Sequence, residues 1–235
     1  MQRLQSFKKA KTKPELARLL GVKPAVLTYC LYVVKTESQY SQFRIPKKNG
    51  GDRLINAPTG TLKTIQSSLS NLLLDCLDEI NKEMFPNSEL VKETAKNSKL
   101  LKVKCSNARV KQPSISHGFE RKRSIITNAM MHLGKKHVFN IDLEDFFGSF
   151  NFGRVRGFFI KNEHFQLIPE IATVIAKIAC HNNELPQGSP CSPVIANLIA
   201  HSLDIRLTKL ASSNSSTYTR YADDITFSSR QSDLP

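Results

Sequence analysis

The chain has 235 residues, of which 40% are hydrophobic and 23% charged, a composition typical of a globular protein with a sizeable core. Lys and Arg number 34 against 20 Asp and Glu, and the resulting formal net charge of +14 is typical of proteins that bind the phosphate backbone of nucleic acid. The sequence has no apolar run near the roughly 20 residues of a membrane helix, no secretion signal and no Cys-x-x-Cys pair, so we expect a cytoplasmic protein without a membrane partner or a structural zinc site.

Two short helices are predicted in an N-terminal helical segment over residues 1–40. Leu16 and Leu19 share one helical face, and the pattern stops at Gly21 and restarts after Pro24. A small packing unit is the favoured interpretation. A DNA-binding helix-turn-helix is the alternative, although no base-reading residues stand out.

A basic β-hairpin is predicted next, because strand-like segments alternate on both sides of a Gly-Gly turn. Its tip carries Lys47, Lys48 and Arg53, whose side chains can grip phosphate groups. Apolar residues over 62–80 then recur at helical spacing and predict an amphipathic helix with a core face. A basic stretch over 81–113 has weak periodicity, which indicates a long loop or a short irregular hairpin. Solvated charge is the favoured interpretation of this stretch, and an RNA contact is the alternative.

Three aspartates lie on or beside predicted strands in the second half of the chain. Phe139 and Ile141 fall on one face of a strand, whereas Asp142 falls on the other face. Helical segments and a Ser-rich turn follow, and a final hairpin carries Asp223 and Asp224 at its bend. This order of elements predicts an α+β fold with an antiparallel sheet and packed helices.

Adjacent carboxylates repel each other unless a cation holds both ionised. If the strand with Asp142 neighbours the hairpin with Asp223 and Asp224, the three side chains converge. Such hard oxygen ligands suit Mg²⁺, and two Mg²⁺ ions could support an in-line phosphoryl transfer. Taken singly, Asp142 or Asp224 could equally be an ordinary surface acid.

Several motifs resemble those of a known polymerase family. The stretches YADD (221–224), DLEDFF (142–147) and LPQGSPCSP (185–193) resemble, in order, three motifs of reverse transcriptases. The stretch SHGFERKRSIITNAMMH, with Asn128 and His132, resembles the retron reverse transcriptases in particular. The resemblance spans most of the chain from the hairpin to the C-terminus.

The resemblance implies a right-hand polymerase fold, with fingers over 41–135 and part of a palm over 136–235. It also implies copying of an RNA template into DNA, with deoxynucleoside triphosphates as substrates and Mg²⁺ as the cofactor. The family normally continues through the remaining palm into a helical thumb, and retron enzymes carry a Val-Thr-Gly element there. We therefore expect this chain to lack the thumb and to show little activity by itself.

Residue roles follow from the resemblance by matching position. Asp142 and Asp223 match the metal ligands, and Asp224 matches the third acid of the site. Phe147 matches the aromatic residue beneath the sugar, where its ring would clash with a ribose 2′-OH and so select deoxyribonucleotides.

The same comparison assigns residues around the incoming nucleotide and the RNA. Gln187 and Gly188 match the loop along the nucleotide, and the three basic residues at the hairpin tip match triphosphate ligands. Asn128 and His132 match an RNA-placing element, although a structural role for His132 is equally open.

Retron enzymes copy part of their own structured non-coding RNA into single-stranded DNA, primed from a 2′-OH, to give a branched RNA–DNA product used in anti-phage defence. The resemblance implies the same RNA and DNA partners here, and an effector or toxin protein as a further partner. The alternative is an RNA-binding module that keeps the palm shape without catalysis.

Overall fold

The computed structural model describes residues 2–46, 50–84 and 115–230. A short 3₁₀ helix, η1 (Thr36–Gln39), leads into the first strand. The other helices and strands are, in chain order, α1 (Gln2–Lys9), α2 (Lys13–Leu19), α3 (Pro24–Tyr32), β1 (Tyr40–Pro46), β2 (Asp52–Pro58), α4 (Gly60–Met84), α5 (Ile125–Met130), β3 (His137–Asp142), α6 (Phe152–Lys161), α7 (Pro169–Ala179), α8 (Ser192–Ser213), β4 (Ser216–Tyr221) and β5 (Asp224–Ser229).

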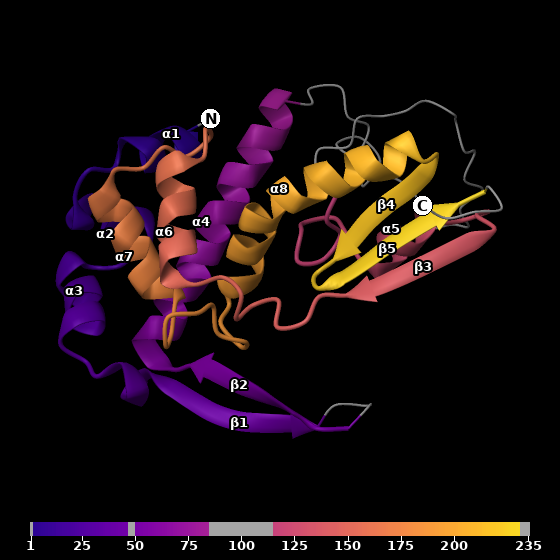
Figure 1. Cartoon of the computed structure of the whole chain (residues 1–235). Helices are drawn as coiled ribbons and strands as arrows, with labels where there is room; N and C mark the ends of the chain where they lie inside the picture. Colours follow the sequence, from indigo (N-terminus) through magenta and orange to yellow (C-terminus); the bar gives the residue numbers. More distant parts are fainter. Residues whose placement is uncertain (1, 47–49, 85–114, 231–235) are drawn as a thin grey trace, which may run out of the picture.

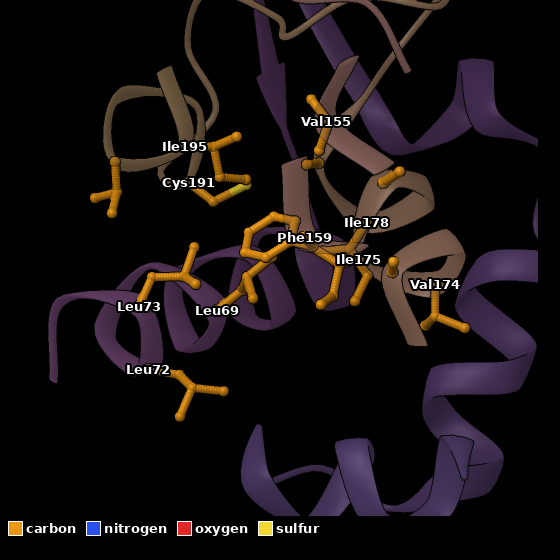
Figure 2. Close-up of a cluster of buried hydrophobic side chains, with 14 of the residues drawn as sticks. Leu69, Leu72, Leu73, Val155, Phe159, Val174, Ile175, Ile178, Cys191 and Ile195 are labelled. Atoms are coloured by element: carbon orange, nitrogen blue, oxygen red, sulfur yellow. The ribbon is translucent and has the colours of Figure 1, made fainter. Parts of the chain in front are cut away.

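The long helix α4 is central to the helical part of the molecule, where it contacts α1, α3, α7 and α8. Its apolar stripe is buried, as the periodicity predicts. Leu69 and Leu73 of α4 lie in the same cluster as Phe159 of α6, Ile175 of α7 and Ile195 of α8, and all five side chains are fully buried (Figure 2). This core fixes α8, the helix that leads into the hairpin with the paired aspartates.

The N-terminal helices form part of this core. Leu16 of α2 and Leu27 of α3 are fully buried within it, which supports the packing-unit interpretation of the predicted helix pair. The pattern did not predict α1, which contacts α4 and buries Leu4 and Phe7 in the core. Among the described residues, no helix has the length and apolarity needed to cross a membrane.

Both sheets are antiparallel, which confirms the predicted α+β class. The strands β1 and β2 form the predicted hairpin, and β3, β5 and β4 form a three-stranded sheet in that order (Figure 1). Helix α8 packs on β4, and a small core of Ala211, Tyr218, Ile225 and Phe227 lies between helix and sheet.

The strand β3 lies at the edge of the described sheet. Its predicted apolar face is therefore only partly covered, since Phe139 is 52% exposed and Ile141 is 40% exposed. The periodicity correctly predicts the strand. Alternation predicts which side chains share a face, whereas the burial of that face also depends on what packs against it.

Candidate active site

The three predicted aspartates meet at one end of the three-stranded sheet. Asp142, the last residue of β3, pairs directly with Asp224, the first residue of β5. Ala222 and Asp223 form the turn between β4 and β5, and the backbone N–H of Leu143 donates to the Asp223 carbonyl at 3.1 Å. Directly paired residues of antiparallel strands project from the same face, so Asp142 and Asp224 share one side of the sheet.

The aspartates also interact electrostatically. Partial burial raises the pKa of the Asp224 carboxyl, and the neighbouring carboxylates of Asp223 and Asp142 raise it further. Asp142 and Asp224 are exposed, and Asp223 is half-buried. The site therefore concentrates negative charge in a protein of net charge +14, and bound cations would relieve the repulsion.

The donor chemistry of this site fits Mg²⁺. Carboxylate oxygens are its preferred protein ligands, and Mg²⁺ at phosphoryl-transfer sites takes one or two carboxylates, completing its shell with water and substrate phosphates. Within the described residues, no group of three or more His, Cys, Asp or Glu side chains is arranged to hold a metal ion. The fit therefore rests on ligand type and strand register.

Phe147 lies in the loop that follows Asp142. Its half-buried ring makes an edge contact with Phe146, with ring centroids 5.4 Å apart, and Phe146 in turn makes an edge contact with Phe150 at 5.0 Å. Phe146 and Phe150 are buried in the main core, so the Phe147 ring packs against a side chain that the core holds in place.

The loop with Gln187 and Gly188 packs against the second strand of the hairpin. The Asn56 backbone N–H donates to the Gln187 carbonyl at 2.7 Å. Gly188 has φ +114, and a Cβ there would lie 2.8 Å from a methyl carbon of Ile55 and 3.0 Å from the Asn56 carbonyl oxygen. Glycine is therefore required for this close approach.

Buried hydrogen bonds hold the same loop from beneath. Ser189 donates to the side-chain oxygen of Gln66 at 2.7 Å, and the Gln66 amide donates to the Tyr40 hydroxyl and the Ile178 carbonyl. Gln66 is fully buried on α4, so it connects the loop to β1 and α7.

The predicted basic residues at the hairpin tip are only partly described. Arg53 is exposed on β2, and among the described residues no hydrogen bond or ion pair joins it to an aspartate of the site. Lys47 and Lys48 lie outside the described residues. Arg53 lies three residues before Asn56 on β2, and Asn56 binds the Gln187 loop. The strand β2 therefore carries the predicted basic residue Arg53 and also holds the predicted nucleotide loop.

His132 has both ring nitrogens in hydrogen bonds to the sheet. Nδ1 lies 2.6 Å from the Ser228 hydroxyl, and Nε2 lies 2.7 Å from the Thr219 hydroxyl. Burial lowers the pKa of this histidine, and Lys135 lowers it further. These contacts support the structural role for His132. The half-buried Asn128 of α5 has a side-chain oxygen without a partner among the described residues, and its predicted RNA contact stays a prediction.

The sequence patterns missed a buried ion pair directly beneath the site. Arg220, two residues before the turn, is fully buried and forms a two-pronged ion pair with Asp204 of α8 at 2.8 Å. Burial alone would lower the pKa of Arg220, but the Asp204 carboxylate raises it above its ordinary value. The only sequence signal is an arginine on a strand beside the YADD stretch.

Comparison with known proteins identifies the class to which this fold and site belong. The family described as reverse transcriptase (RNA-dependent DNA polymerase) matches residues 45–234, and the chain belongs to this family.

The relatives of this chain narrow the class to the retron type, as the motifs predict. The chain is 31% identical to the retron Mx65 reverse transcriptase of Myxococcus xanthus over 235 aligned residues, which cover 93% of this chain and 47% of that protein. It is 32% identical to the retron Mx162 enzyme of the same organism, with coverage of 91% and 41%. It is 47% identical to the retron Ec86 reverse transcriptase of Escherichia coli over 49% of this chain and 35% of that protein. The chain thus matches less than half the length of each of these relatives.

Proposed function

We propose that this protein acts as an RNA-directed DNA polymerase of the retron type. The observation that carries the proposal is the direct pairing of Asp142 with Asp224 beside the turn that holds Asp223. Three carboxylates at one end of a sheet, in a basic protein, suit metal-dependent synthesis on a nucleic-acid template. The fingers would correspond to residues 41–135 and part of the palm to residues 136–235.

Asp142 and Asp223 would hold two Mg²⁺ ions, and Asp224 would be the third acid. When bound, the ions would supply charge stabilisation for the attacking hydroxyl and the leaving pyrophosphate. The negatively charged carboxylates of the aspartates would bind the cations, and the turn after Tyr221 would position the Asp223 carboxylate.

The residues around the carboxylates would orient the deoxynucleotide. The Phe147 ring, supported by Phe146, would lie beneath the sugar and exclude a ribose 2′-OH. Gln187 and Gly188 would line the nucleotide, while Arg53, with Lys47 and Lys48, would bind its triphosphate.

The template would be a structured non-coding RNA that the protein binds, and the product would be a branched RNA–DNA molecule. This product would serve in anti-phage defence, with an effector or toxin protein as a further partner. Support for this finer proposal comes from the similarity to proteins described as retron reverse transcriptases. Asn128 is the proposed RNA contact near the palm. His132 would be a second RNA contact, or it would hold the helix that carries Asn128 against the sheet.

Primer extension on an RNA template by the full-length gene product, in Mg²⁺ with deoxynucleotides, tests this function. We expect Asp223→Asn to abolish incorporation. A matched Glu163→Gln change, at a carboxylate whose side chain is 83% exposed, should leave it intact. Unchanged synthesis by Asp223→Asn would refute the metal assignment. Salt-sensitive RNA binding without synthesis in the wild type would instead identify a non-catalytic RNA-binding module.

A further inference from the structure

The buried ion pair beneath the sheet is anchored on α8. Asp204 accepts hydrogen bonds from Nε and Nη2 of Arg220 and from the Tyr218 hydroxyl, all at 2.8 Å. The side chains of Arg220 and Asp204 are 0% and 1% exposed, so neither charge is screened by water. The paired, planar geometry gives the guanidinium one fixed orientation.

The remaining guanidinium nitrogen reaches the turn that carries the aspartates. Nη1 of Arg220 donates to the Ala222 carbonyl at 2.8 Å and to the Asn197 side-chain oxygen at 3.0 Å. Ala222 has φ +58, in the left-handed region that an alanine rarely occupies, so the turn needs external support.

The same side chain also contacts the loop after Asp142. The guanidinium carbon lies 5.5 Å from the centre of the Phe146 ring, and Phe146 supports Phe147. Arg220 therefore touches both halves of the candidate site: the loop that follows Asp142 and the turn with Asp223.

The segment with His117 and Gly118 also packs against the turn. Asn197 donates to the Gly118 carbonyl at 2.7 Å, and the His117 N–H donates to the Arg220 carbonyl at 2.7 Å. A Cβ on Gly118 would lie only 2.6 Å from the Ala222 backbone nitrogen. Only glycine lets this segment sit directly against the turn.

We propose that Arg220 is a positioning residue for the aspartate site, and that the turn with Ala222 and Asp223 packs directly against Gly118. This inference rests on the proposed function, because it concerns the geometry in which the aspartates receive cations. Arg220 itself is fully buried, so it would act through its neighbours and not by direct contact with substrate or metal. It fixes the Ala222 carbonyl and the Phe146 ring relative to each other, and so sets the spacing between Asp142 and the Asp223–Asp224 pair.

Metal binding by the full-length gene product separates this role from a structural one. The probe is Mn²⁺, titrated by electron paramagnetic resonance, with the thermal midpoint of unfolding measured in parallel. Arg220→Met alone would leave the Asp204 charge buried and unpaired, so the variant replaces the ion pair together with the hydroxyl bonded to it: Arg220→Met, Asp204→Leu and Tyr218→Phe. Replacing a complete buried ion pair by apolar residues commonly preserves stability.

We expect the triple variant to stay folded, with its thermal midpoint lowered only by the loss of the donor to the Ala222 carbonyl, and to weaken Mn²⁺ binding by about 10- to 100-fold, the range typical of outer-shell partners. Gly118→Ala changes no charge, and it should weaken Mn²⁺ binding in the same direction. Gly157→Ala is the matched control, because a Cβ on Gly157 meets no atom within 4 Å.

Asp223→Asn defines which bound Mn²⁺ belongs to the site. If Asp223→Asn removes Mn²⁺ while both the triple variant and Gly118→Ala bind it as the wild type does, the positioning role is refuted and the proposed function stands. If Asp223→Asn leaves Mn²⁺ binding unchanged, the metal assignment in the proposed function falls, and this inference falls with it. Should the triple variant not fold, Gly118→Ala decides alone: weakened binding supports the role, and wild-type binding refutes it.

Discussion

Phe147 offers the most direct residue-scale test of sugar selection. Its ring is held from one side by Phe146, so the proposed clash with a 2′-OH comes from a group that cannot easily move aside. Phe147→Val shortens the side chain, and we expect discrimination against ribonucleotides to fall by about 10- to 100-fold, the range typical of small steric differences. Primer extension with matched deoxy- and ribonucleotides measures this ratio. Continued rejection of ribonucleotides would remove Phe147 from the sugar gate.

The raised pKa of Asp224 predicts that the free energy of unfolding depends on pH and on bound metal. Because its pKa is raised in the folded protein, its ionisation favours the unfolded state, and stability declines as the pH rises from the ordinary value of 3.8 through the folded pKa. Asp224→Asn should therefore stabilise the metal-free protein at neutral pH, by less than about 1 kcal/mol since the side chain is exposed.

The gain from Asp224→Asn should vanish at a pH below 3.8, where the wild-type carboxyl is protonated in both states. Mg²⁺ should stabilise the wild type more than the variant. Thermal unfolding across pH, with and without Mg²⁺, measures both effects. A destabilised variant at neutral pH without metal would contradict the carboxylate repulsion.

At the scale of elements, Gln66 connects helix α4 to the loop with Gln187. Replacing it by Met keeps the volume but leaves the Ile178 carbonyl without its donor and Ser189 without its acceptor. We expect a loss of about 1–3 kcal/mol in the free energy of unfolding, the cost of unpaired buried polar groups. Denaturant unfolding measures this loss. The control Gln42→Met, on exposed β1, should change stability by less than about 0.5 kcal/mol.

The loop that Gln66 supports also predicts a kinetic effect. Gly188→Ala would place a Cβ 2.8 Å from Ile55, in a backbone conformation with φ +114. The loop must then move away from β2, so we expect a higher KM for deoxynucleotides with RNA affinity unchanged. Steady-state primer extension and RNA titration distinguish the two quantities. An unchanged KM would place the Gln187 loop outside the nucleotide site.

The elements differ in how far the sequence predicts them. Strand-like segments and turn residues predicted both hairpins, and helical spacing predicted α4, whose apolar stripe is buried. The short helix α1 has only Leu4 and Phe7 as buried residues, too few for a periodic signal. The Arg220–Asp204 pair was missed for another reason. It depends on how α8 packs on β4, and no local pattern encodes that packing.

The approach of Asp142 to Asp224 depends in the same way on long-range pairing. Periodicity predicted the two strands but not that β3 lies beside β5, and the resemblance of the motifs suggested that arrangement. Sequence patterns therefore predict which residues carry the chemistry. The register and the buried supports beneath them come from the packing of the whole molecule.

At the scale of the whole molecule, the net charge of +14 predicts strongly salt-dependent RNA binding. Each phosphate neutralised by Lys or Arg releases counterions, so a complex with about six phosphate contacts should lose about 10³-fold in affinity between about 50 and 200 mM salt. Fluorescence anisotropy with a labelled structured RNA measures the slope. Asp223→Asn removes one negative charge at the site without adding a phosphate ligand, so it should keep the wild-type slope while losing synthesis. If RNA affinity did not change with salt concentration, the basic surface would not be the nucleic-acid binding surface, even if the aspartates support synthesis.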